Sequence, residues 1–136
     1  MYTFIKEERL CNKKLLEKLF RDGSSFLLYP FRIVWLSQSR ETANVPVQVV
    51  IGVPKRRFKR AVDRNLLKRR IREVYRLNKS EYLYSFLQEP PAELLLGIHY
   101  IGKEIEEYAF IEKKLKLALQ QLKQHYLINH VEKRCE

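Results

Sequence analysis

The stretch KRAVDRNLLKRRIREVYR, residues Lys59–Arg76, combines a dense positive charge with a regular apolar pattern. Eight of its eighteen residues are Lys or Arg, and only Asp63 and Glu73 are acidic. At 100° per residue, its Leu, Ile and Val side chains fall on one half of a helix and a row of cations falls on the other. That cationic row comprises Arg60, Arg64, Lys68, Arg72 and Arg76. The pattern predicts a helix with a core-facing side and a side that faces a strongly negative partner.

Charge spacing within this helix favours a ligand over a merely solvated basic face. Like charges at i,i+4 destabilise an isolated helix by about 0.2–0.5 kcal/mol per pair, and the cationic row contains four such pairs in succession. Arginine dominates the row, and its planar fork suits bidentate contacts to phosphate. Asn65 is an uncharged amide beside the row, able to read a ribose 2′-hydroxyl or a base edge. A local hydrogen bond to neighbouring backbone is an equal alternative for Asn65.

The chain's positive charge is concentrated in one segment. The net charge is +11, and residues 55–76 hold eleven Lys or Arg against two acidic residues, which leaves the rest of the chain nearly neutral. Such a patch indicates a polyanionic partner, nucleic acid first and an anionic membrane second. The apolar side, with Leu67, Ile71 and Val74, is too moderate for a membrane-inserting face. We therefore expect a nucleic acid as the partner, and no membrane.

Length and composition predict one domain over residues 1–136, with a core at about 9–127 and a short flexible C-terminal tail. The N-terminal MYTFIKEERL lacks the apolar run of a secretory signal, and no run approaches the roughly 20 residues that span a bilayer. A cytoplasmic location follows as an expectation. Cys11 and Cys135 belong to no C-x-x-C pair, which favours free thiols over a disulfide.

The remaining segments predict two more helices and four strands. Asn12 is a suitable N-cap for the first helix, and Gly23 is placed as its left-handed C-cap. Pro30 divides an aromatic and β-branched run into two strands, and the run VQVVIGV predicts a central strand. The order α-β-β-β-α-β-α defines an α+β fold, a two-layer α/β sandwich with helices covering a small sheet. Beyond the basic helix, the predicted elements are helices at 13–21 and 104–127 and strands within 25–36, at 47–53 and at 93–101.

Residues able to form a protein active site or metal centre are scarce. The two Asp residues, Asp22 and Asp63, are isolated and form no D-x-D or D-x-E pair able to hold Mg²⁺. The three His residues lack a Ser, Cys or carboxylate partner at a telling spacing: His99, His125 and His130. We expect no catalytic residue and no metal site formed by protein side chains alone.

The segment RAVDRNLLKRRIRE resembles the Arg-Asn motif of the bacterial ribonuclease P protein family, A-V-x-R-N-x-x-K-R-x-x-R-E. The lead-in VVIGVPKRRFKRAV, the segment KLFRDGSSF and the segment ELLLGIHYI with the final helix also resemble that family, in the same order over about residues 9–125. The motif positions that match are Ala61, Val62, Arg64, Asn65, Lys68, Arg69, Arg72 and Glu73.

This resemblance implies a fold like domain 2 of ribosomal protein S5, with a left-handed βαβ crossover that is an exception to the usual rule. It implies the non-catalytic protein subunit of an endoribonuclease. The RNA subunit hydrolyses precursor tRNA to release the 5′ leader, with Mg²⁺ bound mainly through RNA phosphates. The implied partners of this single RNA-binding domain are ribonuclease P RNA and precursor tRNA, and no DNA is expected. The implied RNA-binding residues are Lys55, Arg56, Arg57, Arg60, Arg64, Asn65, Lys68, Arg69, Arg72 and Arg76.

The resemblance also implies a cleft for the single-stranded leader between the first helix and the sheet. Family members often carry two Phe four residues apart on that helix and a Tyr on the second strand. Here Phe20 matches the second Phe, whereas Leu16 and Val34 occupy the other two positions, so stacking on the leader is weaker or uses other aromatic residues. Phe31 and Phe20 are the expected cleft aromatics, and Trp35 is expected in the core on the opposite face. The alternative function is a ribosomal or ribosome-assembly RNA-binding protein with the same fold.

Overall fold

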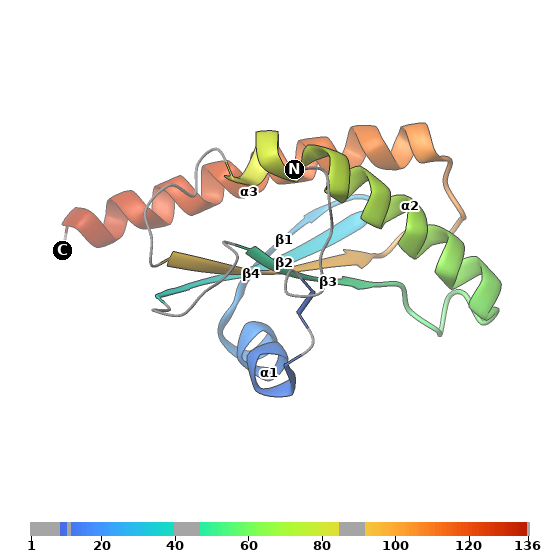
Figure 1. The fold of residues 1–136 in the computed structure, drawn as a ribbon, viewed down its shortest axis with the longest axis horizontal. Coiled ribbons are helices and arrows are strands. Elements are labelled where there is room, and N and C mark those ends of the chain that lie inside the picture. The colour runs from blue at the N-terminus through green and yellow to red at the C-terminus, as the bar shows by residue number, and fades with distance from the viewer. Residues whose placement is uncertain (1–8, 11, 40–46, 85–91, 136) are drawn as a thin grey trace.

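The computed structural model describes residues 9–10, 12–39, 47–84 and 92–135 as an α+β sandwich (Figure 1). A four-stranded sheet has the order β1-β2-β4-β3, and the α+β class is confirmed. The elements are α1 (Lys13–Asp22), β1 (Ser24–Leu28), β2 (Phe31–Ser39), β3 (Val47–Gly52), α2 (Ala61–Lys79), a π-helical turn η2 (Ser80–Tyr84), β4 (Ala92–Tyr100) and α3 (Tyr108–Cys135). The hand of the β3–α2–β4 crossover stays a prediction.

Strand β3 lies at an edge of the sheet, so the prediction of a central strand there is wrong. It pairs in parallel with β4, whereas β2 pairs antiparallel with both β1 and β4. The outer side of β3 is met by the N-terminal segment, where Leu10 N–H donates to Val49 O at 2.9 Å. The strand is apolar because both of its faces are covered: Val49 lies in the main core and Val50 packs toward α1.

The sheet carries helices on both faces (Figure 1). Helices α2 and α3 cover one face and form the main core with it, whereas α1 covers part of the other. Alternation along β2 sends Ile33 and Trp35 into the main core and Val34 toward α1. The predicted core position of Trp35 is confirmed, because its side chain is 4% exposed there.

Helix α1 begins as the sequence predicts but ends differently. Asn12 is the N-cap, and its Oδ1 accepts from Lys14 N–H at 2.9 Å and from Leu15 N–H at 3.3 Å. Gly23 has φ −73° and ψ 152°, so the predicted left-handed cap is wrong. Its N–H donates to Leu19 O at 2.9 Å, and a Cβ at Gly23 would lie 2.3 Å from that oxygen. Glycine is therefore required here by close approach to the backbone of α1.

Helix α2 is rotated about its axis relative to the predicted orientation. Its buried side chains include Leu67, Ile71, Val74 and Tyr75, an arc turned by roughly 60° toward Arg64 at 100° per residue. Leu77 comes directly after the stretch Lys59–Arg76 and continues its predicted apolar side at 100° per residue, but it is 38% exposed because of this rotation. The rotation brings Arg64 of the predicted cationic row toward the core, where it is half-buried, and leaves Arg60 and Arg72 exposed.

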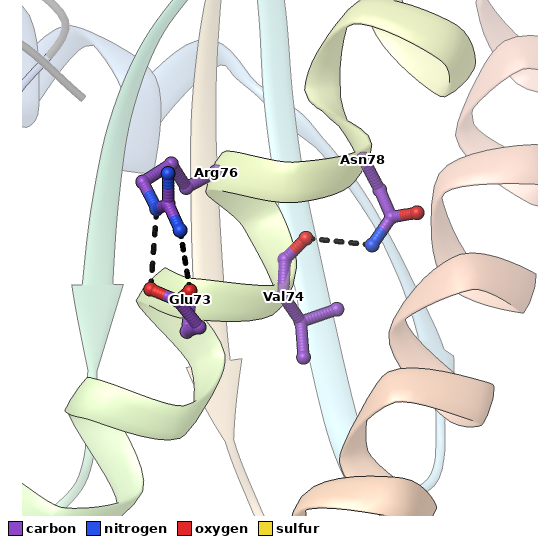
Figure 2. A network of polar contacts seen from close by, with 4 residues as sticks. All are labelled: Glu73, Val74, Arg76 and Asn78. Carbon is purple, nitrogen blue, oxygen red and sulfur yellow. Dashed lines mark hydrogen bonds and ion pairs between the residues drawn. The ribbon is translucent and has the colours of Figure 1, made fainter. Parts of the chain in front are cut away.

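The end of α2 and the π turn that follows it are more buried than their polar sequence indicates. Asn78 and Lys79 are buried, and Leu83 in the π turn is fully buried. Asn78 Nδ2 donates to Val74 O at 2.8 Å (Figure 2). This bond to the backbone of its own helix satisfies one donor of the buried amide, so the helix continues past the position where its amphipathic pattern ends.

Helix α3 begins at Tyr108 and runs to Cys135, later at both ends than predicted. The residues expected to form a tail after Leu127 are helical because no Gly or Pro interrupts them. Arg70 of α2 donates from Nη1 to Glu106 O at 2.5 Å and ties α2 to the loop before α3. Cys11 and the side chains of Cys135 and His130 lie outside the described residues.

Candidate nucleic-acid interface

The outer side of α2 and its N-cap present a set of cations to solvent. Arg60, Arg69 and Arg72 are exposed, and Lys68 is half-buried. Asn65 is exposed among them. Within the part of the chain that the structure describes, these five side chains have no hydrogen bond or ion pair. The local hydrogen bond considered for Asn65 is therefore not formed, and its amide faces solvent with the cations.

Arg64 belongs to the same motif but has a structural role as well. Its Nη1 donates to Phe58 O at 2.8 Å and to Lys59 O at 2.9 Å. These two carbonyls belong to the segment that enters α2, whose N-cap Arg60 forms no side-chain cap. Asp63 lies in the first turn of the helix, where a negative charge is favourable to the helix dipole. This gives a physical reason for the acidic residue that interrupts the basic run.

Arg76, the last member of the predicted row, is paired with an acid. Its Nε donates to Glu73 Oε2 at 3.1 Å and its Nη2 donates to Glu73 Oε1 (Figure 2). The hydrogen bond from Arg76 lowers the pKa of the Glu73 carboxyl, and the same bond raises the pKa of Arg76. The pair places a negative charge beside this cation, so we expect Arg76 to contribute less to polyanion binding than Arg72.

A second feature is a hollow of about 330 Å³ beside α1, at the ends of β3 and β4. Rings, cations and aliphatic side chains line it, among them Phe20, Arg32, Val34, Arg56, Arg57 and His99. Arg56 and Arg57 come from the turn between β3 and α2, and Arg57 Nη1 donates to Ile101 O at 2.5 Å. These two members of the basic turn thus line the hollow, not the outer side of α2. Lys55 is exposed in the same turn.

The predicted cleft residues divide between the two faces of the sheet. Phe20 is 53% exposed and lines the hollow with Val34. Leu16 packs against the small core beneath α1 and is not among the residues that line the hollow. The prediction that Phe31 lies in the cleft is wrong. Its side chain is fully buried in the main core, where the centroids of its ring and the Tyr100 ring are 6.0 Å apart. Alternation along β2 places Phe31 on the same face as Trp35, away from α1.

Arg32 and His99 are site residues that the sequence analysis missed. They are cross-strand partners in β2 and β4, and His99 pairs with Gly52 in β3. Burial of the imidazole lowers the pKa of His99, and the nearby positive charge of Arg32 lowers it further. A pair on neighbouring strands is visible only once the register is known, so no local pattern in the sequence reveals it.

The described residues offer neither a metal centre nor a membrane-spanning helix. They contain no group of three or more His, Cys, Asp or Glu side chains placed to hold a metal ion. None of their helices is long and apolar enough to cross a membrane. The chemistry available to the two surfaces is therefore cationic, amide and aromatic.

A small sheet with a cationic helix on one face and a basic, ring-lined hollow on the other defines an α+β nucleic-acid-binding protein. A family model described as Ribonuclease P matches residues 4–90. The ribonuclease P protein component of Porphyromonas gingivalis is 33% identical over 114 residues, covering 84% of this chain and 82% of that protein. That of Petrotoga mobilis is 36% identical over 103 residues, covering 72% and 83%.

Solved structures show the same fold. The Staphylococcus aureus ribonuclease P protein superposes with a TM-score of 0.64 at 20% identity, covering 85% of this chain and 95% of that one. The Thermotoga maritima protein gives 0.65 at 23% identity, covering 84% and 96%. The chain belongs to the ribonuclease P protein family. Its role is that of an RNA-binding protein component in the ribonucleoprotein that processes tRNA.

Proposed function

We propose that the two basic surfaces bind two different RNAs. The exposed cations on α2 bind ribonuclease P RNA, and the hollow beside α1 holds the single-stranded 5′ leader of precursor tRNA. The protein thereby assists endonucleolytic removal of the leader, which leaves the mature 5′ end of the tRNA. The observation that carries this proposal is that the two surfaces differ in chemistry and lie at different helices, the exposed cations on α2 and the hollow beside α1. These two helices lie on opposite faces of the sheet (Figure 1).

The outer side of α2 suits a folded RNA. Arg69, Arg72 and Lys68 stand free of acidic partners within the described residues, so they are available for phosphate oxygens. Each phosphate that such a cation neutralises releases counterions and makes binding salt-dependent. Asn65 adds a donor and an acceptor for a 2′-hydroxyl or a base edge. Nothing on this side of the helix offers a ring on which an unpaired base stacks.

The hollow suits an unpaired strand. Its volume lies at the lower end of the range typical of small-ligand pockets, so it admits a nucleotide-sized group and excludes a duplex. Phe20 and His99 supply ring faces, and Arg32, Arg56 and Arg57 supply charge for the adjoining phosphates. Stacked bases beside a cationic groove are the usual means of binding single strands without a fixed sequence.

The bond-breaking chemistry is assigned to the RNA subunit. The described residues include no cluster able to hold a metal ion, so Mg²⁺ is taken to be bound mainly through RNA phosphates. The protein's contribution is then to bind and orient the two RNAs. The proposed location is the cytoplasm.

The two-surface assignment is tested by equilibrium binding with single variants. Lys68→Ala lowers the affinity for ribonuclease P RNA and reduces the slope of log affinity against log salt by about 0.7–0.9. Lys123→Ala is the matched control, since it removes an exposed lysine from α3. Phe20→Ala, on the hollow, lowers the affinity of the assembled holoenzyme for precursor tRNA and not for mature tRNA. The assignment of α2 is contradicted if Lys68→Ala and Lys123→Ala lower the affinity for ribonuclease P RNA equally. The assignment of the hollow is contradicted if Phe20→Ala lowers the affinity for precursor and mature tRNA equally.

A further inference from the structure

His99 has an unusual position on the α1 side of the sheet. Side chains normally stand roughly perpendicular to a sheet, but this imidazole lies along it. A Cβ built on Gly52, its partner in β3, would lie 2.8 Å from His99 Nδ1. A Cβ built on Gly97, two residues earlier in β4, would lie 3.1 Å from His99 Nε2. The ring therefore fills the space that the Cβ atom of a larger residue would take at position 52 or 97.

Gly52 and Gly97 form a cradle for the His99 ring, and this ring is the only reason for glycine at the two positions. Neither Gly52 nor Gly97 has a positive φ, so backbone conformation does not demand glycine at these positions. What each glycine provides is the space taken by the imidazole, and Gly97 also faces Leu19 of α1. His99 is thus held flat by packing on the floor of the hollow, with the ring of Phe20 beside it at 5.4 Å between centroids and 45° between planes.

The imidazole is held there without a hydrogen bond at Nε2. That atom is buried and has no hydrogen-bond partner among the described residues. Burial and the positive charge of Arg32 lower the pKa of His99, which keeps the ring neutral at neutral pH. A buried Nε2 is not available to read a base edge, so what the ring offers a ligand is its face.

We propose that His99 is a contact residue for the single strand, and that the Gly52–Gly97 cradle holds its ring as a floor on which one nucleobase stacks. This inference rests on the proposed binding of the leader in the hollow and adds a specific residue and a mode of contact. Because the contact is made by a ring face, it is tolerant of base identity and sensitive to removal of the base.

The test is a double-mutant cycle in which a change in the protein is combined with removal of a base from the leader, and the binding affinity is measured for each combination. Precursor tRNAs carrying a single abasic nucleotide at each leader position in turn are bound to holoenzyme containing wild-type protein or His99→Ala. With wild-type protein, we expect one leader position at which base removal lowers affinity roughly five- to hundred-fold, the range for one stacked base. With His99→Ala, base removal at that position has little further effect. His99→Phe keeps a ring and keeps the sensitivity.

Two further variants separate contact from general destabilisation. Gly52→Ala retains His99 but forces its ring to move, so it loses the same abasic sensitivity. His125→Ala removes an exposed histidine that stacks on Phe26 on the other face of the sheet, and it keeps the full wild-type profile. A folding defect would weaken binding of every precursor tRNA. It would not abolish the effect of base removal at a single leader position.

The outcomes distinguish this inference from the proposed function. If wild-type holoenzyme loses affinity at some leader position and His99→Ala loses it equally there, the His99 contact is wrong while leader binding in the hollow stands. If wild-type holoenzyme binds precursor and mature tRNA equally, leader binding in the hollow is wrong and the His99 contact is overturned with it.

Discussion

Arg64 and Arg72 belong to one sequence motif but have different surroundings, and alanine at the two positions has different consequences. Arg64 Nη1 donates to two backbone carbonyls, of Phe58 and Lys59, and its side chain is only partly exposed. Arg72 is exposed and has no partner within the described part of the chain. We therefore expect Arg64→Ala to lower both stability and RNA affinity, and Arg72→Ala to lower RNA affinity alone.

The size of the Arg64 effect follows from its two hydrogen bonds. A hydrogen bond to a charged group contributes about 1.5–3 kcal/mol net when buried, but water competes at this partly exposed site. A total of about 1 kcal/mol is reasonable after that discount. For a chain of this length, such a loss lowers Tm by roughly 3–5 °C. Arg72→Ala is a surface substitution and changes the free energy of unfolding by less than about 0.5 kcal/mol.

The assay pairs thermal unfolding of the free protein with salt-dependent binding of ribonuclease P RNA. For Arg72→Ala, we expect an unchanged Tm and a salt slope reduced by about 0.7–0.9. For Arg64→Ala, we expect the lower Tm together with weaker binding. An unchanged Tm for Arg64→Ala would refute its structural role, and a drop of several degrees for Arg72→Ala would refute the view that this residue serves only the ligand.

Two further variants test the local structure and the titration of the hollow. Asn12→Ala removes the N-cap of α1 and lowers stability by about 1 kcal/mol, whereas Asn65→Ala, which breaks no bond, leaves Tm unchanged; equal Tm values for the two variants would contradict the capping role. The folded pKa of His99 lies below its unfolded value of 6.5, so the unfolded chain takes up the proton first and stability falls as pH decreases through that window. Unfolding measured between about pH 8 and pH 5 should show a shallower loss for His99→Phe than for wild type; parallel curves for the two proteins would show that His99 is not buried as described.

Local patterns in the sequence predicted the elements because each depends on neighbouring residues. Asn12 caps α1 through its own side chain, and the apolar repeat of the last helix buries Ile111, Leu115 and Leu119 as expected. The division of the strand at Pro30 is also local, since this residue lies in the turn between β1 and β2. Such features need no knowledge of the rest of the fold.

Features that depend on several elements at once were predicted less well. The apolar strand β3 was expected at the centre of the sheet, but coverage of both faces makes an edge strand equally apolar. The orientation of α2 is set by packing against α3 and the sheet, so Arg64 and Leu77 could not be placed from the helix periodicity alone. Phe31 was assigned to the wrong face, although the alternation that placed Trp35 in the core applies equally to it.

In the candidate site, too, the features within one element were predictable and those that join several elements were not. The cations of α2 were visible as a repeat within one helix, and the structure leaves Arg60, Arg69 and Arg72 exposed. The hollow needs the register of three strands, because Arg32, His99 and Gly52 meet across β2, β4 and β3. Residues that meet only through strand pairing leave no local pattern in the chain.

The central claim is that this chain is the protein component that enables ribonuclease P RNA to process precursor tRNA. The most direct measurement mixes the protein with a bacterial ribonuclease P RNA and precursor tRNA over a series of Mg²⁺ concentrations, and follows release of the 5′ leader. We expect stoichiometric protein to lower the Mg²⁺ concentration needed for half-maximal cleavage. We expect the protein without the RNA to release no leader. Leader release whose Mg²⁺ dependence is unchanged across a protein titration would contradict the central claim.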